Sequence, residues 1–309
     1  MKRLTNGLIA IGMAFSAIAA TPTITGVTAQ QRYPWNGKVD ISYTVTGDIA
    51  AEAKERGLLT SLKVTATDRD ANTTYTATAL SGDRSLAAGT HSIVWDMDAQ
   101  GLSFKSSNVV FSVACEATPA LYCVIDLSAG ANASSYPVTY LAAPPSGGFN
   151  VDTYKTTKLV LRRISKGTNS AGGAIANDMW VGIFEITKSQ WLRVDSRDDV
   201  LIYGDLHGES RPADAVPIER IQKDFLPAIR NRTGIPGFCL PTEAEWEYAC
   251  RAGTTTKYNN GRDDENGLKL VGRYDGNRAP GWAGPNHYHA IVGSYVPNAW
   301  GLYDICMGM

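Results

Sequence analysis

Residues 238–254, FCLPTEAEWEYACRAGT, constrain the fold of this chain more than any other segment. Thr242 is suited to cap a helix, because its hydroxyl accepts a hydrogen bond from a backbone N–H left without a partner in the first turn. Glu245, three residues later, can accept in return from the Thr242 N–H, which completes a capping box. The pattern predicts a short, strongly specified helix over residues 243–251.

The rest of this segment supports the same helix. Glu247 and Arg251 have i,i+4 spacing with the acid first, which is the favourable order, and Gly253 is a C-terminal stop signal. Trp246, Ala249 and Cys250 should form one apolar stripe. Every residue here therefore has a structural role available, and a substrate is not needed to explain any of them.

Two further segments carry recognisable local chemistry. Residues 181–192, VGIFEITKSQWL, repeat the capped-helix pattern, with Thr187 as the N-cap, Gln190 as its capping-box partner, and Ile186 and Trp191 as a hydrophobic staple. Residues 293–304 read GSYVPNAWGLYD. Between these segments, apolar residues recur at helical spacing over residues 217–233, and Pro227 should split that run into two short helices.

The segments 181–192, 238–254 and 293–304 together resemble the formylglycine-generating enzyme, or sulfatase-modifying factor, family. The resemblance implies an α+β, C-type-lectin-like domain over residues 158–309. Enzymes of this family bind copper(I) through two cysteines and use oxygen to convert a sulfatase cysteine to formylglycine, and the family also binds structural calcium.

The chain departs from the family pattern in two places. The family's Gly-x-Phe-x-Met-Gly segment reads KGTNSAGG at residues 166–173. The family's Gly-Asn-x-Trp-Glu-Trp run does not follow Asp304, and Cys306 is not at the family's copper position. The domain is therefore expected to be C-terminally incomplete. No catalytic and no cofactor-binding residue is assigned, and the metal ligands are left open.

The N-terminus has the pattern of a secretory signal peptide. A basic start with Lys2 and Arg3 precedes an apolar run from Leu8 to Ala17 and a small-residue cleavage site at residues 17–19. We expect residues 1–19 to be removed, no transmembrane segment in the mature chain, and a periplasmic, secreted or cell-surface location. Removing Lys2 and Arg3 leaves 27 of 29 basic residues against 30 acidic ones, a net charge near −3. With no basic cluster, nucleic acid is not an expected partner.

Residues 23–114 have an all-β pattern, with period-two alternation at 39–45, 62–66 and 109–113 and turn signals between the strands. This predicts a β-sandwich. Residues 86–101, LAAGTHSIVWDMDAQG, resemble immunoglobulin-like modules of bacterial secreted proteins, so His91 and Trp95 are interpreted as packing residues. Residues 51–59 are predicted to form a charged, helix-prone insertion. Residues 115–157 are assigned as a connector.

Some residues are open to a ligand-binding interpretation. The polar stretch 258–286 offers hard oxygen donors of the kind that bind calcium, or forms a solvated loop; the candidates are Asn259, Asp263, Asp264, Asp275 and Asn277. His287 and His289 would share one face of a strand, but no third metal ligand is evident. His207 is interpreted as an isolated loop residue.

The five cysteines leave alternatives open, because an odd number in an exported protein leaves at least one unpaired. Cys115 and Cys123 are close enough in sequence to bridge two strand ends, and Cys239 and Cys250 flank the predicted helix. Buried thiols are the alternative for both pairs.

Three functions are consistent with the sequence. The first is an exported enzyme, or an incomplete copy of one, that acts on a sulfatase or another exported protein; the chain as it stands is expected to be inactive. The second is a non-catalytic surface or adhesion protein that binds a carbohydrate or peptide ligand. The third is a non-functional fragment.

Overall fold

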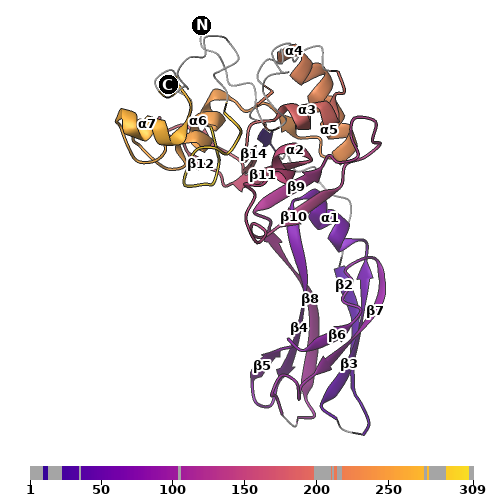
Figure 1. Ribbon diagram of the computed structural model, residues 1–309. Coiled ribbons are helices and arrows are strands. Elements are labelled where there is room, and N and C mark those ends of the chain that lie inside the picture. Colours follow the sequence, from indigo (N-terminus) through magenta and orange to yellow (C-terminus); the bar gives the residue numbers. More distant parts are fainter. Residues whose placement is uncertain are drawn as a thin grey trace. The chain divides into compact units, whose positions relative to one another are not determined.

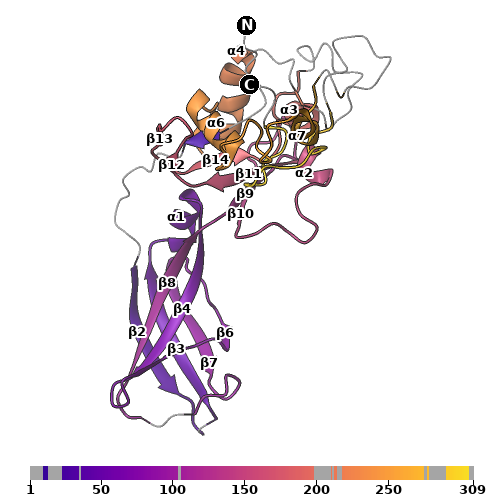
Figure 2. The same ribbon diagram turned by 90° about the vertical axis from the view of Figure 1, so that its left-hand side faces the viewer.

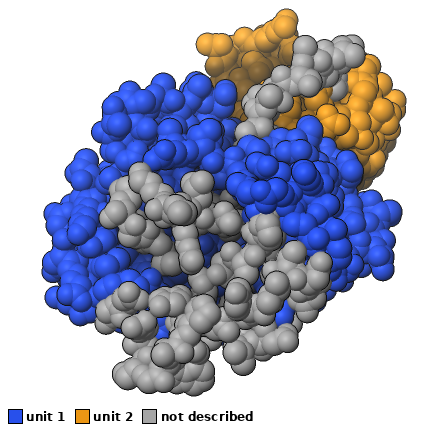
Figure 3. All heavy atoms as spheres, turned by 90° about the horizontal axis from the view of Figure 1, so that it is seen from above, with its two compact units in different colours: residues 1–14, 120–309 blue, residues 15–119 orange. Residues whose placement is uncertain are grey.

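The computed structural model describes residues 10–12, 23–34, 36–103, 106–197, 210, 212–213, 218–274, 277 and 290–305. The chain divides into two compact units, one of residues 15–119 and one of residues 1–14 with 120–309 (Figure 3). No helix among the described residues is long and apolar enough to cross a membrane.

The unit of residues 15–119 consists of two antiparallel sheets, in the strand orders β2-β3-β7-β6 and β5-β4-β8 (Figure 1). Its elements are β2 (Thr23–Gln31), β3 (Lys38–Thr46), α1 (Ile49–Glu55), β4 (Leu58–Asp68), β5 (Thr73–Thr76), β6 (Leu80–Gly82), β7 (Gly89–Asp96) and β8 (Val109–Pro119). Alternate residues of β3, β4 and β7 point into one shared core around Tyr43, Val64 and Trp95. The all-β prediction for this region is confirmed as two packed sheets, whereas its immunoglobulin-like character stays a prediction.

Two details of this unit bear on the sequence interpretation. The predicted insertion ends earlier than expected, because Leu58 and Leu59 already belong to β4. His91 is buried, and its two ring nitrogens lie 2.8 Å from Asp83 Oδ2 and 2.8 Å from the Ala87 carbonyl oxygen. Both partners accept hydrogen bonds, and Asp83 raises the pKa of His91. His91 thus holds the β6–β7 connection in place, in agreement with a packing role.

The other unit is built on a six-stranded antiparallel sheet in the order β10-β9-β11-β14-β1-β15 (Figure 2). Its strands are β1 (Ala10–Gly12), β9 (Tyr122–Asp126), β10 (Val138–Leu141), β11 (Lys158–Ile164), β14 (Met179–Gly182) and β15 (Phe238–Cys239), with β12 (Gly167–Thr168) and β13 (Ala174–Ile175) forming a separate pair. Its helices are α2 (Thr153–Thr156), α3 (Lys188–Val194), α4 (Ile218–Arg220), the π-helix η2 (Ile221–Phe225), α5 (Leu226–Thr233), α6 (Glu243–Arg251) and α7 (Glu265–Val271).

This sheet draws strands from two ranges to which the sequence assigned other roles. β9 and β10, with α2, come from the range 115–157 that was assigned as a connector. β9 pairs with β11 from Lys158↔Asp126 to Arg162↔Tyr122, so the sheet begins well before residue 158. Residues 10–12, within the predicted signal peptide, form β1 between β14 and β15.

The predicted helical run is divided into short elements, and Pro227 lies in the first turn of the last one, α5. The structure differs from the prediction in that η2 leads into α5 without an intervening loop. A proline N–H is missing, so a regular α-helix would lose a hydrogen bond at this point. The preceding π-turn changes the hydrogen-bond spacing there, and the Leu226 N–H donates to the Ile221 carbonyl oxygen.

Both predicted capping boxes are confirmed. α6 spans the predicted residues, with the Glu245 N–H 3.3 Å from Thr242 Oγ1 and the Thr242 N–H 2.8 Å from the Glu245 carboxylate. α3 has the same arrangement, with Thr187 as the N-cap and Gln190 as the partner. Ala249 and Cys250 are buried, and Trp246 packs against the same core.

Replacing Thr242 with alanine is expected to lower the free energy of unfolding by about 1 kcal/mol, because the hydroxyl that accepts from the Glu245 N–H and donates to the Glu245 carboxylate is lost. Urea denaturation provides the measurement. Thr255→Ala is the matched control, since Thr255 is exposed and lies beyond the helix. Equal unfolding midpoints for the two variants would show that the capping box does not stabilise the fold.

Candidate functional site

The segments 238–254 and 293–304 meet in the core through the side chain of Asn298. Asn298 is only 5% exposed. Its Nδ2 donates to the carbonyl oxygens of Ala249 at 2.7 Å and Cys250 at 3.0 Å, which lie at the end of α6. Its Oδ1 accepts from the N–H groups of Trp300 at 3.0 Å and Leu302 at 3.1 Å. The Asn298 side chain therefore supplies hydrogen-bond partners to the last turn of α6 and to two backbone N–H groups of its own segment.

The aromatic residues of the second segment complete this junction. Trp300 packs edge-on against Tyr248 of α6, with ring centroids 4.9 Å apart. The ring centroids of Tyr303 and Phe184 are 5.0 Å apart, and the Tyr303 N–H donates to the Ile183 carbonyl oxygen at 2.9 Å. Leu302 and Ile305 belong to the same core cluster as Ala249 and Cys250. The two segments thus hold each other in the core, and the contacts of residues 238–254 agree with the structural role that the sequence offered for them.

Asp304, at the end of the segment 293–304, forms a hydrogen bond with the first residue of the same segment. Its Oδ2 accepts from the Gly293 N–H at 2.6 Å, and the Gly293 carbonyl oxygen accepts from Asn150 Nδ2 at 3.0 Å. Gly293 has a φ of 75°, and a Cβ at this position would lie 2.7 Å from Asn150 and Phe184. Only glycine fits here, because both the backbone conformation and the close approach exclude a side chain.

Among the described carboxyl groups with a shifted pKa, Asp304 has the pKa that lies furthest from its ordinary value. Burial raises its pKa to about 6, against the opposing effects of the Gly293 N–H and the charge of Lys155. Its other oxygen, Oδ1, is buried and has no hydrogen-bond partner among the described residues. A perturbed carboxyl group with an unused oxygen is the kind of group found at functional sites.

The surroundings of Asp304 combine charge with aromatic side chains. Lys155 is 8% exposed, and its Nζ lies 5.7 Å from the centre of the Phe184 ring. Burial raises the pKa of both Tyr295 and Tyr303, and the charge of Asp304 adds to each effect. The cluster can hold or release a proton at Asp304 near pH 6. Sequence reasoning missed it, because Lys155 and Asp304 are far apart along the chain.

The described cysteines do not fit a two-thiolate copper site. Cys250 is disulfide-bonded. Cys123 is buried, and burial raises the pKa of its thiol to about 12, so the thiolate that copper requires is disfavoured. Cys115 and Cys239 keep their thiols but belong to different units. The Cys115–Cys123 and Cys239–Cys250 bridges are therefore not formed. Cys306 lies outside the described residues.

The candidate calcium ligands are largely committed to local contacts. Asp263 accepts from the Lys257 N–H, Asp264 caps α7 through the Gly267 N–H, and Asn277 accepts from the Tyr274 N–H. Asn259 is buried, and its Oδ1 has no hydrogen-bond partner in the part of the chain that the structure describes. The described residues hold no group of three or more acidic, histidine or cysteine side chains arranged for a metal. Asp275, His207, His287 and His289 lie outside the described residues.

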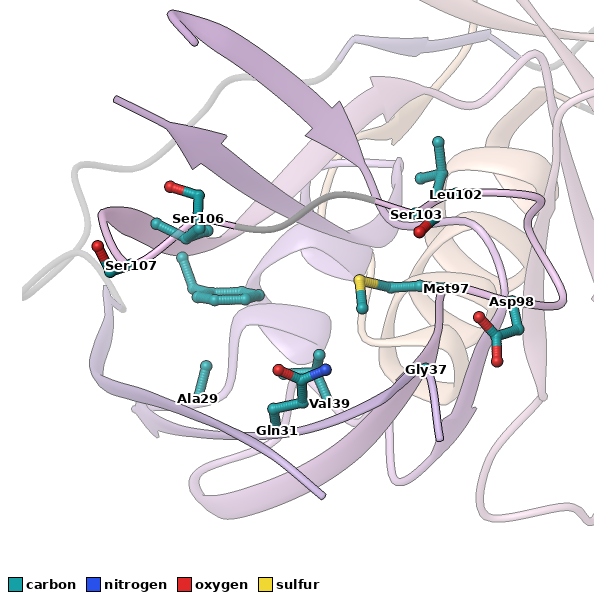
Figure 4. A pocket seen from close by; sticks show the side chains of 12 residues that line it. Ala29, Gln31, Gly37, Val39, Met97, Asp98, Leu102, Ser103, Ser106 and Ser107 are labelled. Carbon is teal, nitrogen blue, oxygen red and sulfur yellow. The ribbon is translucent and has the colours of Figure 1, made fainter. Parts of the chain in front are cut away.

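A cavity of about 950 Å³ opens in the unit of residues 15–119, between β2, β3 and β8 (Figure 4). Val39, Met97 and Phe111 contribute apolar surface, and Gln31, Asp98 and three serines contribute polar groups. The described part of its lining consists of apolar, hydroxyl, amide and carboxylate side chains. The chemistry of this wall is suited to binding.

Comparison with known proteins finds a similarity to one family in the C-terminal part of the chain. Residues 168–308 match the family described as sulfatase-modifying factor enzyme 1-like domain. The chain is also 42% identical over 73 residues to the formylglycine-generating enzyme of Mycobacterium tuberculosis (strain ATCC 25618 / H37Rv), a match that covers 21% of this chain and 23% of that protein. The chain thus spans less than a quarter of the length of this relative. No solved structure matches the chain. Residues 168–308, which are less than half of the chain, are thus similar to the sulfatase-modifying factor enzyme 1-like family.

Proposed function

We propose that the protein is exported and that its sulfatase-modifying-factor domain acts on a cysteine-containing segment of a sulfatase. The family match over residues 168–308 carries this proposal. Further support comes from the local identity to a formylglycine-generating enzyme, whose name states the product. In this role the domain holds the segment that contains the target cysteine.

We further propose that residues 1–309 alone do not oxidise the target cysteine. The thiol chemistry supports this part. A two-thiolate copper site needs two accessible thiolates close together, whereas Cys250 is committed to a disulfide and Cys123 is buried and protonated at neutral pH. Cys239, at the end of β15, is the one described thiol of this unit outside these constraints.

The test is to incubate the purified chain with a cysteine-containing sulfatase peptide, copper(I) and oxygen, and to search for the aldehyde by mass spectrometry. We expect no aldehyde above a protein-free control, with the Mycobacterium tuberculosis enzyme as the positive control. Turnover would contradict the lack of oxidation. Calorimetry with the same peptide tests binding separately, and an absence of binding would contradict the proposed substrate.

A non-catalytic ligand-binding or adhesion role is the second candidate, and the cavity of residues 15–119 favours it. Its volume of about 950 Å³ lies in the range of small-molecule sites. The mixture of hydroxyl, amide and apolar side chains fits a carbohydrate or a short peptide. A glycan and peptide array distinguishes the candidates, because binding that Met97→Trp abolishes would assign the function to this cavity.

A further inference from the structure

The central position of β1 in its sheet has a consequence for binding. Ala10 lies opposite both Val181 of β14 and Cys239 of β15, and Ile11 lies opposite both Trp180 and Phe238. β14 and β15 do not pair with each other in the described sheet. Residues 10–12 therefore fill a slot one strand wide, and Figure 2 shows this short indigo strand beside β14.

Each wall of the slot is held by contacts that do not involve β1. β14 pairs with β11 over four residues, from Leu161↔Gly182 to Ile164↔Met179. β15 is anchored by Arg230 of α5, whose Nε donates to the Phe238 carbonyl oxygen at 2.8 Å. The two walls should therefore keep their positions when residues 10–12 are absent.

The same residues lie inside the segment that the sequence predicts to be removed on export. Neighbouring strands are about 4.8 Å apart, so loss of β1 leaves β14 and β15 about 10 Å apart. The backbone groups that β1 now satisfies would face an empty slot. Such groups require a partner, and an open strand edge is a template for pairing with another chain.

We propose that the slot between β14 and β15 is a strand-acceptor site. In the processed protein it binds an extended, proline-free, apolar peptide segment of another chain, antiparallel to both walls. Backbone hydrogen bonds to two strands at once provide the affinity, as in other cases of β-strand addition. The walls favour an apolar segment, because Trp180, Val181 and Phe238 are apolar. The proposal rests on the export and processing proposed above and is independent of the sulfatase-directed activity.

The experiment uses the chain from Ala20 to Met309 and a fluorescent peptide with the sequence of residues 7–15 and a lysine tail for solubility. Fluorescence anisotropy measures binding. We expect saturable binding that is at least tenfold weaker for the same peptide with Ile11→Pro, because proline removes the N–H needed for the ladder. The full chain from Met1 is the matched control and should bind at least tenfold more weakly, because its own segment occupies the slot.

Hydrogen exchange locates the bound peptide. Peptide-dependent protection of the amides of β14 and β15 supports the proposal, as does folding of the Ala20 chain only when the peptide is added. The proposal is overturned if the folded Ala20 chain binds neither peptide, or if it binds both equally. It is also overturned if the chain is unfolded and the peptide does not restore the near-ultraviolet circular dichroism.

Discussion

Replacing Asp304 with asparagine is expected to stabilise the protein at pH 7.5 by up to about 3 kcal/mol, since a shift of one pKa unit corresponds to about 1.4 kcal/mol. Burial raises the pKa of Asp304 from its ordinary 3.8 to about 6 in the folded state. The folded protein therefore binds more protons than the unfolded chain between these two values. Stability falls as the pH rises through this window, and the whole cost of burying the charge is present above pH 6.

Asparagine removes this titration and keeps the local geometry. Its side-chain oxygen can still accept from the Gly293 N–H, and asparagine tolerates the positive φ of 55° at this position. The gain is reduced because Lys155 loses an attractive charge. Urea denaturation from pH 4 to pH 8 should show two curves that converge near pH 4 and separate toward pH 7.

Asp178 is a suitable control, because its pKa is shifted in the opposite direction from that of Asp304. Burial opposes its ionisation, but the Lys166 N–H and the Arg163 guanidinium outweigh burial and hold its pKa below the usual range. Asp178→Asn should therefore lose stability at neutral pH. An Asp304→Asn variant with the same pH dependence as the unmodified protein would contradict the assignment of a buried, titrating carboxyl group.

Replacing Asn298 with alanine is expected to lower the free energy of unfolding by on the order of 4 kcal/mol. The substitution leaves two carbonyl oxygens and two N–H groups in the core without their partner. Each buried group that loses its hydrogen bond costs about 1–3 kcal/mol, and these costs are not strictly additive. The measurement is the urea midpoint, together with hydrogen exchange of the last turn of α6.

Ser294→Ala is the control for Asn298, because it lies in the same segment and its exposed hydroxyl bonds only to the nearby Ile291 carbonyl oxygen. We expect its effect to stay within about 0.5 kcal/mol, as for most surface substitutions. If Asn298→Ala costs no more than Ser294→Ala, the two segments do not depend on this side chain for their packing.

The elements that the sequence predicted well are those with local causes. Thr242, Glu245, Thr187 and Gln190 act within one helical turn, so their capping boxes can be read from spacing alone. The alternation of β3, β4 and β7 is likewise visible in single strands, because each strand buries every second residue in one core. The structural role of residues 238–254 was predicted, whereas their packing against residues 293–304 through Asn298 was not.

The features decided by the tertiary structure depend on partners distant in sequence. The pKa of Asp304 reflects burial beside Gly293 and Lys155, and no spacing rule brings Lys155 to that carboxyl group. β1 is three residues long and has no strand pattern of its own. Its place is set by antiparallel backbone pairing with β14 and β15. Local sequence determined the capped helices and alternating strands because their hydrogen bonds and side-chain periods are short-range. The site and the strand slot were determined by burial and by long-range backbone pairing, which only the folded chain provides.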